Sequence, residues 1–196
     1  MITLVAAVVL WGVVHSIMAS LSFKGFLRNI LGEKTMRGYR FVYNLFSIIS
    51  FVPILWLMRF LPDRTLYAVP APWIYFMLIG QGLSVFALLV TLLQTDALAF
   101  AGLRQFSDGD KTPALVSSGF YGVVRHPLYL FGLLFLWLTP VMTINLLTVY
   151  LLLTIYIFIG ATLEERKLAF EFGTAYAEYK SKTPMIIPGL IRRRNQ

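Results

Sequence analysis

The sequence predicts an all-α, polytopic integral membrane protein with about five transmembrane helices. Of its 196 residues, 58% are hydrophobic and 13% are charged, whereas soluble domains are about 45–50% apolar and about 25% charged. The apolar residues are gathered into stretches of about 20, the length that crosses a bilayer as a helix. The chain has no cysteine and two histidines, which excludes disulfides and cysteine nucleophiles, and we expect no metal site.

Three apolar stretches in the amino-terminal half predict three membrane spans, at residues 2–22, 41–61 and 73–94. Pro53 lies inside the second stretch and predicts a kink. The first stretch has neither a basic segment before it nor a small-residue cleavage site, so we expect a retained helix rather than a signal peptide. Residues 1–94 would therefore hold three amino-terminal spans of a single membrane domain covering 1–196.

A longer apolar stretch, residues 127–161, is interrupted by Thr139 and Pro140. It is too long for one spanning helix and short for two. The sequence therefore predicts a tight helical hairpin with arms 127–139 and 142–161, in which prolines mark the helix starts or the turn. The first arm is too short to span alone, so we expect it to extend toward its amino-terminal side or to lie against other helices.

Basic residues predict the orientation of these spans. Fifteen of the 17 lysines and arginines fall in segments that five spans would place on one side, and only Arg59 and Arg64 fall on the other. The positive-inside rule then predicts an external amino terminus and a cytoplasmic carboxyl terminus, in a prokaryotic cytoplasmic membrane. We attribute the net charge of +8 to contact with anionic membrane lipid rather than with nucleic acid, including a basic tail at residues 189–196. Residues 108–113 predict a turn-rich loop on the same side.

Two charged clusters lie at this predicted cytoplasmic boundary. Arg125 and His126 stand where the chain re-enters lipid, and Glu164 and Glu165 follow the last apolar stretch. Ionisable residues at such a boundary are costly unless they bind something, which makes them a candidate site. The alternative is that Arg125 reaches lipid phosphates and that the acidic pair is a solvated charge pair with adjacent basic residues. Both interpretations stay open from the residues alone.

A third feature is an aromatic stripe beyond the acidic pair. Phe172, Tyr176 and Tyr179 follow the spacing of one helical face. We therefore expect the last span to continue as a cytoplasmic amphipathic helix that folds back over the site.

Several motifs, taken in order, resemble the superfamily of isoprenylcysteine carboxyl methyltransferases and phospholipid methyltransferases. The elements are a segment before Arg-His-Pro, the motif itself with its tyrosine, the acidic pair, and the later Phe-Gly-x-x-Tyr-x-x-Tyr, over about residues 112–188. The resemblance implies a membrane methyltransferase that uses S-adenosylmethionine, bound within residues 95–188. It implies cofactor contacts from Leu115, Val116, Gly119, Tyr121, His126, Pro127, Tyr129, Glu164 and Glu165, and catalytic roles for His126, Arg125 and Glu165.

The chemistry of that cofactor matches these residue types. A carboxylate suits its ammonium, and arginine suits its carboxylate in a bidentate pair. Tyrosine faces suit its adenine and sulfonium. Because the thiolate is the reactive form of a thiol, His126 is a candidate base for a thiol substrate. Tyr43, Phe131 and Trp137 are candidates to line a small apolar substrate pocket.

The substrate follows from a narrower resemblance and from one departure. Gly160 stands where the isoprenylcysteine enzymes have an arginine one turn before the acidic pair, which disfavours a carboxylate substrate. Motifs through most of the chain, from His15 to Pro188, resemble the methanethiol S-methyltransferase branch, and the amino-terminal half also resembles nitrite and nitric-oxide-reductase-associated membrane proteins. The predicted substrate is a small thiol or another lipid-soluble nucleophile. The alternatives are phospholipid N-methylation, isoprenylcysteine carboxyl methylation, or a non-catalytic membrane accessory subunit.

Overall fold

The computed structural model describes residues 1–95, 97–103 and 114–189. The predicted loop at 108–113 and most of the basic tail lie outside these residues. So do Asp96, Arg104 and Gln105, which belong to the motifs of the narrower resemblance. The chain forms two compact units, which are described separately. The first unit comprises residues 1–66, 96–112 and 143–152, and the second comprises 67–95, 113–142 and 153–196. The single domain over 1–196 stays a prediction.

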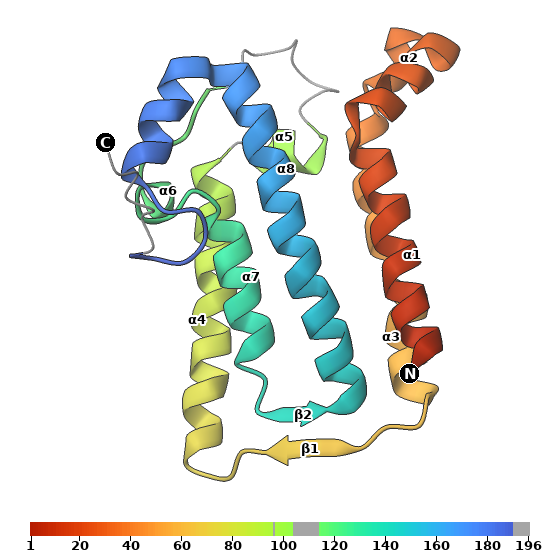
Figure 1. Ribbon diagram of the computed structural model, residues 1–196, viewed down its shortest axis with the longest axis vertical. Coiled ribbons are helices and arrows are strands. Elements are labelled where there is room, and N and C mark those ends of the chain that lie inside the picture. The colour runs from red at the N-terminus through yellow and green to blue at the C-terminus, as the bar shows by residue number, and fades with distance from the viewer. Residues whose placement is uncertain (96, 104–113, 190–196) are drawn as a thin grey trace. The chain divides into compact units, whose positions relative to one another are not determined.

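The first unit is built on a pair of long apolar helices. It contains α1 (Ile2–Ala19), α2 (Leu21–Met36), α3 (Tyr39–Phe60), α5 (Ala97–Ala101) and the start of α8 (Ile144–Lys182). Helix α1 packs along α3 (Figure 1). The Trp11 indole N–H donates to the Ser50 hydroxyl at 3.1 Å, and the Ser47 hydroxyl lies 3.0 Å from His15 Nδ1, so polar contacts as well as apolar packing join the two helices.

The second unit contains the remaining long helices and the two charged clusters. Its helices are α4 (Trp73–Gln94), α6 (Phe120–Val123), α7 (Pro127–Trp137) and the larger part of α8. Helices α4 and α7 lie side by side (Figure 1), and the Gln81 amide donates to the Phe135 carbonyl at 2.9 Å. Two short strands, β1 (Thr65–Ala68) and β2 (Val141–Thr143), form a two-stranded sheet.

The structure is mostly helical and is consistent with the all-α membrane class predicted from the sequence. Helices α1, α3, α4 and α8 are long and apolar enough to cross a bilayer, and the first three begin and end within three residues of the predicted spans. Helix α7, with 11 residues, is too short to span alone and packs along α4, while β2 separates it from α8. Five crossings remain a prediction.

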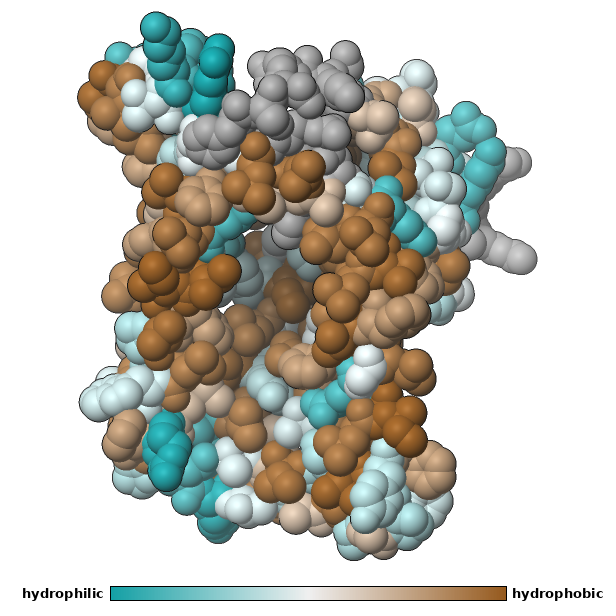
Figure 2. All heavy atoms as spheres, turned by 180° about the vertical axis from the view of Figure 1, so that it is seen from behind, coloured by the Kyte–Doolittle hydropathy of each residue, from teal (hydrophilic) through white to brown (hydrophobic). Residues whose placement is uncertain are grey.

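Apolar side chains are widely exposed on these helices. Leu55 on α3, and Phe86 and Leu93 on α4, are each more than half exposed, and hydrophobic side chains cover much of the face shown in Figure 2. A water-soluble protein rarely exposes contiguous apolar surface on this scale. Lipid contact explains why these helices stay apolar on their outer faces.

Helix α8 is broken at Gly173, which corrects the predicted aromatic stripe. Gly173 has φ +52° and ψ −122°, a conformation that residues with a side chain rarely adopt. The segment after it turns back (Figure 1). Because the break separates Phe172 from Tyr176 and Tyr179, the three residues do not share one continuous helical face. Tyr176 is fully buried and the Tyr179 hydroxyl donates to the Tyr121 carbonyl. The returning segment therefore packs near α6, within the second unit.

Candidate functional site

The Arg-His-Pro motif forms the extended connection between α6 and α7. Val124 has an extended backbone, and Pro127 begins α7 at a position where proline loses no helical hydrogen bond. The backbone N–H groups of Arg125 and His126 donate to the carbonyls of Pro184 and Met185 at 2.9 and 3.0 Å. The connection is therefore paired, strand-like, with the chain segment that follows α8.

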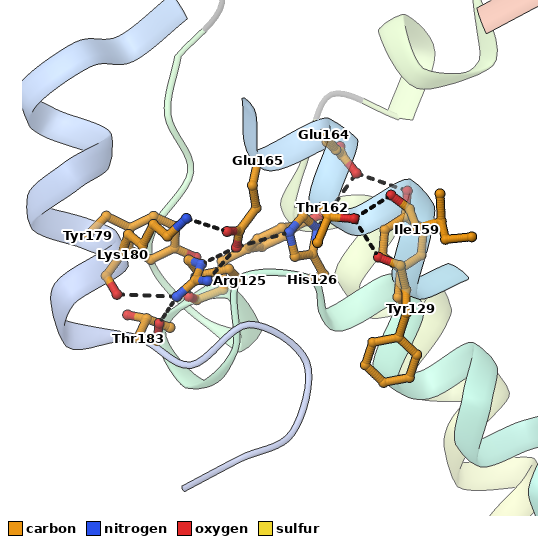
Figure 3. A network of polar contacts seen from close by, with 12 residues as sticks. Arg125, His126, Tyr129, Ile159, Thr162, Glu164, Glu165, Tyr179, Lys180 and Thr183 are labelled. Carbon is orange, nitrogen blue, oxygen red and sulfur yellow. Dashed lines mark hydrogen bonds and ion pairs between the residues drawn. The ribbon is translucent and has the colours of Figure 1, made fainter. Parts of the chain in front are cut away.

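The Arg125 side chain is saturated by the protein itself (Figure 3). Its Nε donates to Glu165 Oε1 at 2.6 Å, and a second guanidinium nitrogen pairs with the same oxygen. Its remaining nitrogen donates to the carbonyls of Lys180 and Thr183. Both side chains of the ion pair are less than a tenth exposed. Arg125 thus joins α8 before its break to the segment after the break, and the acidic partner that it uses is Glu165.

Glu165 has a second cationic partner that the sequence did not suggest. The Lys180 Nζ lies 2.7 Å from Glu165 Oε2. Glu165 follows the apolar part of α8, which ends near Ala161. Burial opposes ionisation of this carboxyl, but His126, Lys180 and Arg125 outweigh it and lower the pKa of Glu165 to about 2. The Glu165 carboxylate therefore stays ionised, and Arg125 and Lys180 balance its charge inside the protein.

Glu164 has the opposite surroundings. Adjacent helical residues point about 100° apart, and the Glu164 side chain is 47% exposed. It accepts a hydrogen bond from the Tyr129 hydroxyl at 2.9 Å. No lysine or arginine pairs with it among the ion pairs of the described residues. Glu164 therefore offers a carboxylate that is oriented, accessible and, within the described residues, not paired with a lysine or arginine.

His126 stands between the two carboxylates. Its Nδ1 lies 3.6 Å from Glu164 Oε2, and its Nε2 lies 3.6 Å from Glu165 Oε1. The ring is 5% exposed and stacks on Tyr129 with centroids 5.3 Å apart. In the described part of the chain, His126 Nε2 and the Tyr176 hydroxyl are the buried side-chain polar atoms without a hydrogen-bond partner. Buried polar atoms are normally paired, and the polar group that faces His126 Nε2 is Glu165 Oε1, just beyond hydrogen-bond distance.

Gly119 adopts its conformation to admit the Gln94 side chain. It has φ +61° and ψ −133°, and Gln94 Oε1 accepts a hydrogen bond from the Phe120 N–H at 3.0 Å. A Cβ at position 119 would lie 2.5 Å from Gln94 Nε2. Gln94 thus fixes the start of α6 from the end of α4. Half-buried Tyr121 follows, and burial and the charge of Glu164 raise its pKa to about 12.

The structure brings some of the predicted site residues together and leaves others apart. Arg125, His126, Tyr129, Glu164 and Glu165 form one cluster (Figure 3). Pro127 is buried beside it as the first residue of α7, and Leu115 and Val116 are half-buried residues upstream of Gly119.

The three proposed pocket residues each contact a different neighbour. The Phe131 ring packs edge-on against Phe120 at 4.9 Å. Trp137 lies at the far end of α7, where its indole N–H donates to Thr154. Tyr43 belongs to the first unit, where its hydroxyl lies 2.5 Å from His15 Nε2. Their role as a substrate pocket stays a prediction.

Sequence reasoning missed Lys180, Gln94 and Thr183 as members of this arrangement. Lys180 directly follows Tyr179 of the aromatic stripe, which is the single sequence signal that could have pointed to it. Gln94 belongs to one of the motifs of the narrower resemblance, but that motif gave it no place in the site. Thr183 comes close to the cluster through tertiary packing, and no local pattern marks it.

Comparison with known proteins matches both likenesses found in the motifs. The NnrU protein family matches residues 3–135. Methanethiol S-methyltransferase of Crocosphaera subtropica is 32% identical over 89% of this chain and 69% of the relative. The protein of the same name from Pseudomonas deceptionensis is 32% identical over 96% and 72%, and that of Mycobacterium tuberculosis is 27% identical over 91% and 74%. No solved structure matches the chain.

The NnrU match ends before the acidic pair, whereas the alignments with the methyltransferases extend over most of the chain. The motif order, the helical membrane fold and these alignments agree. The chain therefore belongs to the NnrU protein family and is a homologue of the methanethiol S-methyltransferases.

Proposed function

We propose that this protein is a membrane methyltransferase that uses S-adenosylmethionine to methylate a small thiol. The relatives' name supports methyl transfer to a thiol. The observation that carries the proposal is the unequal pair Glu164 and Glu165. The charge of Glu165 is balanced inside the protein by Arg125 and Lys180, whereas Glu164 is accessible and, among the described residues, has no lysine or arginine partner. One acidic residue thus builds the site and the other is available to a cationic ligand.

The residues fit the cofactor's chemical groups. Glu164 would hold the ammonium through a charge-assisted hydrogen bond, and the Tyr129 hydroxyl, which donates to the same carboxylate, fixes its orientation. When bound, the cofactor supplies the electrophilic methyl group, and the protein supplies binding and orientation.

Arg125 has a different role from the one that its chemistry first suggested. All three of its nitrogens are taken by Glu165 and by the carbonyls of Lys180 and Thr183, so it is not free to hold the cofactor's carboxylate. We assign Arg125 to positioning. It fastens the segment after Gly173 beside the Arg-His-Pro connection, and a fastened cover excludes water from a methyl-transfer site.

A small neutral nucleophile is the substrate that the chain favours. Residues 127–163 contain no lysine or arginine that could hold a substrate carboxylate. A volatile thiol needs no such contact and reaches the site through the lipid or from water. We place the site on the cytoplasmic side because fifteen of the 17 basic residues fall on that side of the proposed topology, and the cofactor is a charged, water-soluble molecule.

Calorimetric titration of the purified protein in detergent with S-adenosylmethionine tests this assignment. Wild type should bind, and Glu164→Gln should bind about 10- to 100-fold more weakly, because a hydrogen bond to a charged group contributes about 1.5–3 kcal/mol. The matched control is Glu171→Gln, which removes the same charge from an exposed position on the same helix and should bind like wild type. Absence of binding to wild type would contradict the function, and equal affinity in Glu164→Gln would contradict the site.

A further inference from the structure

We infer that His126 is a positioning residue, which sets the Glu164 carboxylate for the cofactor, and that it does not take the proton of the substrate thiol. The inference rests on the proposed function. It assigns a specific role to the one titratable side chain that lies between the structural anion Glu165 and the exposed anion Glu164.

The geometry surrounds the imidazole on three sides (Figure 3). The Nδ1 edge faces Glu164 and the Nε2 edge faces Glu165, each at 3.6 Å. One ring face is covered by Tyr129 in a stacked arrangement with an interplanar angle of 16°. The backbone is held as well, because the His126 N–H donates to the Met185 carbonyl and Pro127 follows directly.

These contacts are unsuitable for a general base. A base must reach the proton that it removes, within about 2.6–3.2 Å or through one water. Both nitrogens of His126 are directed at carboxylates, and the ring is 5% exposed. A thiol that approached either nitrogen would have to displace a carboxylate first, and it would place its own developing negative charge next to another anion. Both requirements work against proton transfer to His126.

The same contacts are suitable for orientation. Glu165 is fixed by Arg125 and Lys180, so the Nε2 edge of His126 rests against an immobile group. The Nδ1 edge and the Tyr129 hydroxyl then approach the same oxygen of Glu164, Oε2, from the Arg-His-Pro segment and from α7. The other carboxylate oxygen of Glu164 remains available for the cofactor's ammonium. His126 therefore transmits the rigidity of the internal ion pair to the binding carboxylate.

A chemical consequence follows for the thiol. If His126 takes no proton, the thiol releases its proton to water before methyl transfer, and the reacting species is the thiolate. The pH dependence of kcat/KM should then follow the acidity of the thiol that is supplied. The pH profile of kcat/KM for a more acidic aryl thiol should be displaced to lower pH than that for an alkyl thiol. Neither profile should lose an inflection when His126 is replaced.

Amide replacements separate the two edges of the ring. In His126→Asn the side-chain amide can occupy the position of Nδ1, near Glu164, and in His126→Gln it can reach the position of Nε2, near Glu165. His126→Ala removes both, and Glu171→Gln on the exposed face of α8 is the control. Each full-length protein in detergent is measured by calorimetry with S-adenosylmethionine and by methyl transfer to both thiols across pH.

We expect His126→Ala to bind the cofactor at least about tenfold more weakly and His126→Asn to recover most of that loss, as expected when one charged hydrogen bond is removed and restored. At saturating cofactor, kcat should change by less than about threefold and the pH profiles should keep their shape.

A base predicts the reverse. Loss of a general base lowers the rate by about 10²–10⁴-fold, so a fall of about 100-fold in kcat with unchanged cofactor affinity would overturn the inference. Equal cofactor affinity in His126→Asn and His126→Ala would overturn it as well. If His126→Ala does not fold, the cofactor affinities of His126→Asn and His126→Gln are compared instead. Positioning of Glu164 requires the asparagine variant to bind the cofactor more tightly than the glutamine variant. If wild type fails to bind the cofactor, the proposed function itself is refuted. If wild type binds the cofactor and His126→Ala binds it with equal affinity, only the role of His126 is refuted.

Discussion

Glu164 and Glu165 are identical residues, one position apart, with different surroundings. The carboxylate of Glu165 is enclosed by Arg125 and Lys180, and that of Glu164 is half exposed beside Tyr129. The difference arises because helical neighbours point in different directions and because the segment after Gly173 covers one of them. Removing one partner of a buried ion pair strongly destabilises the folded protein, whereas an exposed carboxylate contributes little to its stability. Loss of Glu165 should therefore lower the stability of the fold, whereas loss of Glu164 should weaken ligand binding.

Glu165→Gln should lower the melting temperature at pH 7 by on the order of 10 °C, because it leaves buried Arg125 without its anion. The pKa of Glu165 in the folded protein is about 2, below the ordinary value of 4.5. A lowered pKa means that the stabilisation is complete above about pH 4.5 and is lost as the pH falls toward about 2. The gap in melting temperature between wild type and the variant should accordingly close over that interval in a thermal denaturation series.

Glu178→Gln provides the matched control, because Glu178 pairs with Lys182 on the surface and its loss should shift the melting temperature only slightly. A gap between wild type and Glu165→Gln that stays constant from pH 7 to pH 2 would contradict the role of Glu165.

Residue types at the site could be predicted from the sequence, but their partners could not. The motif order placed Arg125, His126 and the acidic pair in one site, and the structure brings them together. The sequence did not show that Arg125 would be saturated internally, because that depends on Lys180 and the carbonyl of Thr183, which reach it only after α8 turns back at Gly173.

At the scale of elements, the break in α8 is the feature that assembles the site. A continuous helix would carry Lys180 and Tyr179 away from Arg125 and Tyr121, whereas the observed break returns them. The periodicity of Phe172, Tyr176 and Tyr179 is typical of one continuous face, and glycine at 173 is the residue that prevents it. Hydrophobic periodicity reports which side chains are buried, but it does not report a change of direction between them.

Gly173→Ala tests this break. No atom lies within 4 Å of the position that a Cβ would take, so the cost is confined to the backbone at φ +52° and should be about 1–3 kcal/mol. We expect a lower melting temperature and faster proteolysis after residue 173. Gly160→Ala is the control in the same helix, since it also meets no neighbouring atom and lacks the positive φ; it should be neutral or slightly stabilising. Equal melting temperatures for the two variants would show that the break is not required.

The elements also show where sequence reasoning was sufficient. Long apolar stretches predicted the ends of α1, α3 and α4 to within three residues, because lipid imposes a simple length and composition on a spanning helix. Helix α2 and the β1–β2 sheet were not predicted. Helix α2 lies in the basic segment between the first two apolar stretches, and strands of three or four residues are too short to leave a pattern.

At the scale of the whole molecule, the proposed function requires that the site around Glu164 lies on the cytoplasmic side of the membrane. Because the chain has no cysteine, a single cysteine can be introduced, labelled with a membrane-impermeant maleimide in cells, and read out on the purified protein without background from its other residues. Thr65→Cys, between the second and third spans, should label in intact cells, and Ser181→Cys should label only after the membrane is opened. Both positions are exposed. Labelling of Ser181→Cys in intact cells would place the site on the wrong side for a cytoplasmic cofactor.

The central claim is that the cluster around Glu164 performs methyl transfer to a small thiol. The most direct measurement is incubation of the protein, in bilayers that contain phospholipid, with methyl-labelled S-adenosylmethionine and methanethiol. We expect labelled dimethyl sulfide in the headspace, with the rate at limiting cofactor reduced at least about tenfold in Glu164→Gln and unchanged in Glu171→Gln. Label in the phospholipid with none in the headspace, or equal rates in the two variants, would contradict the account.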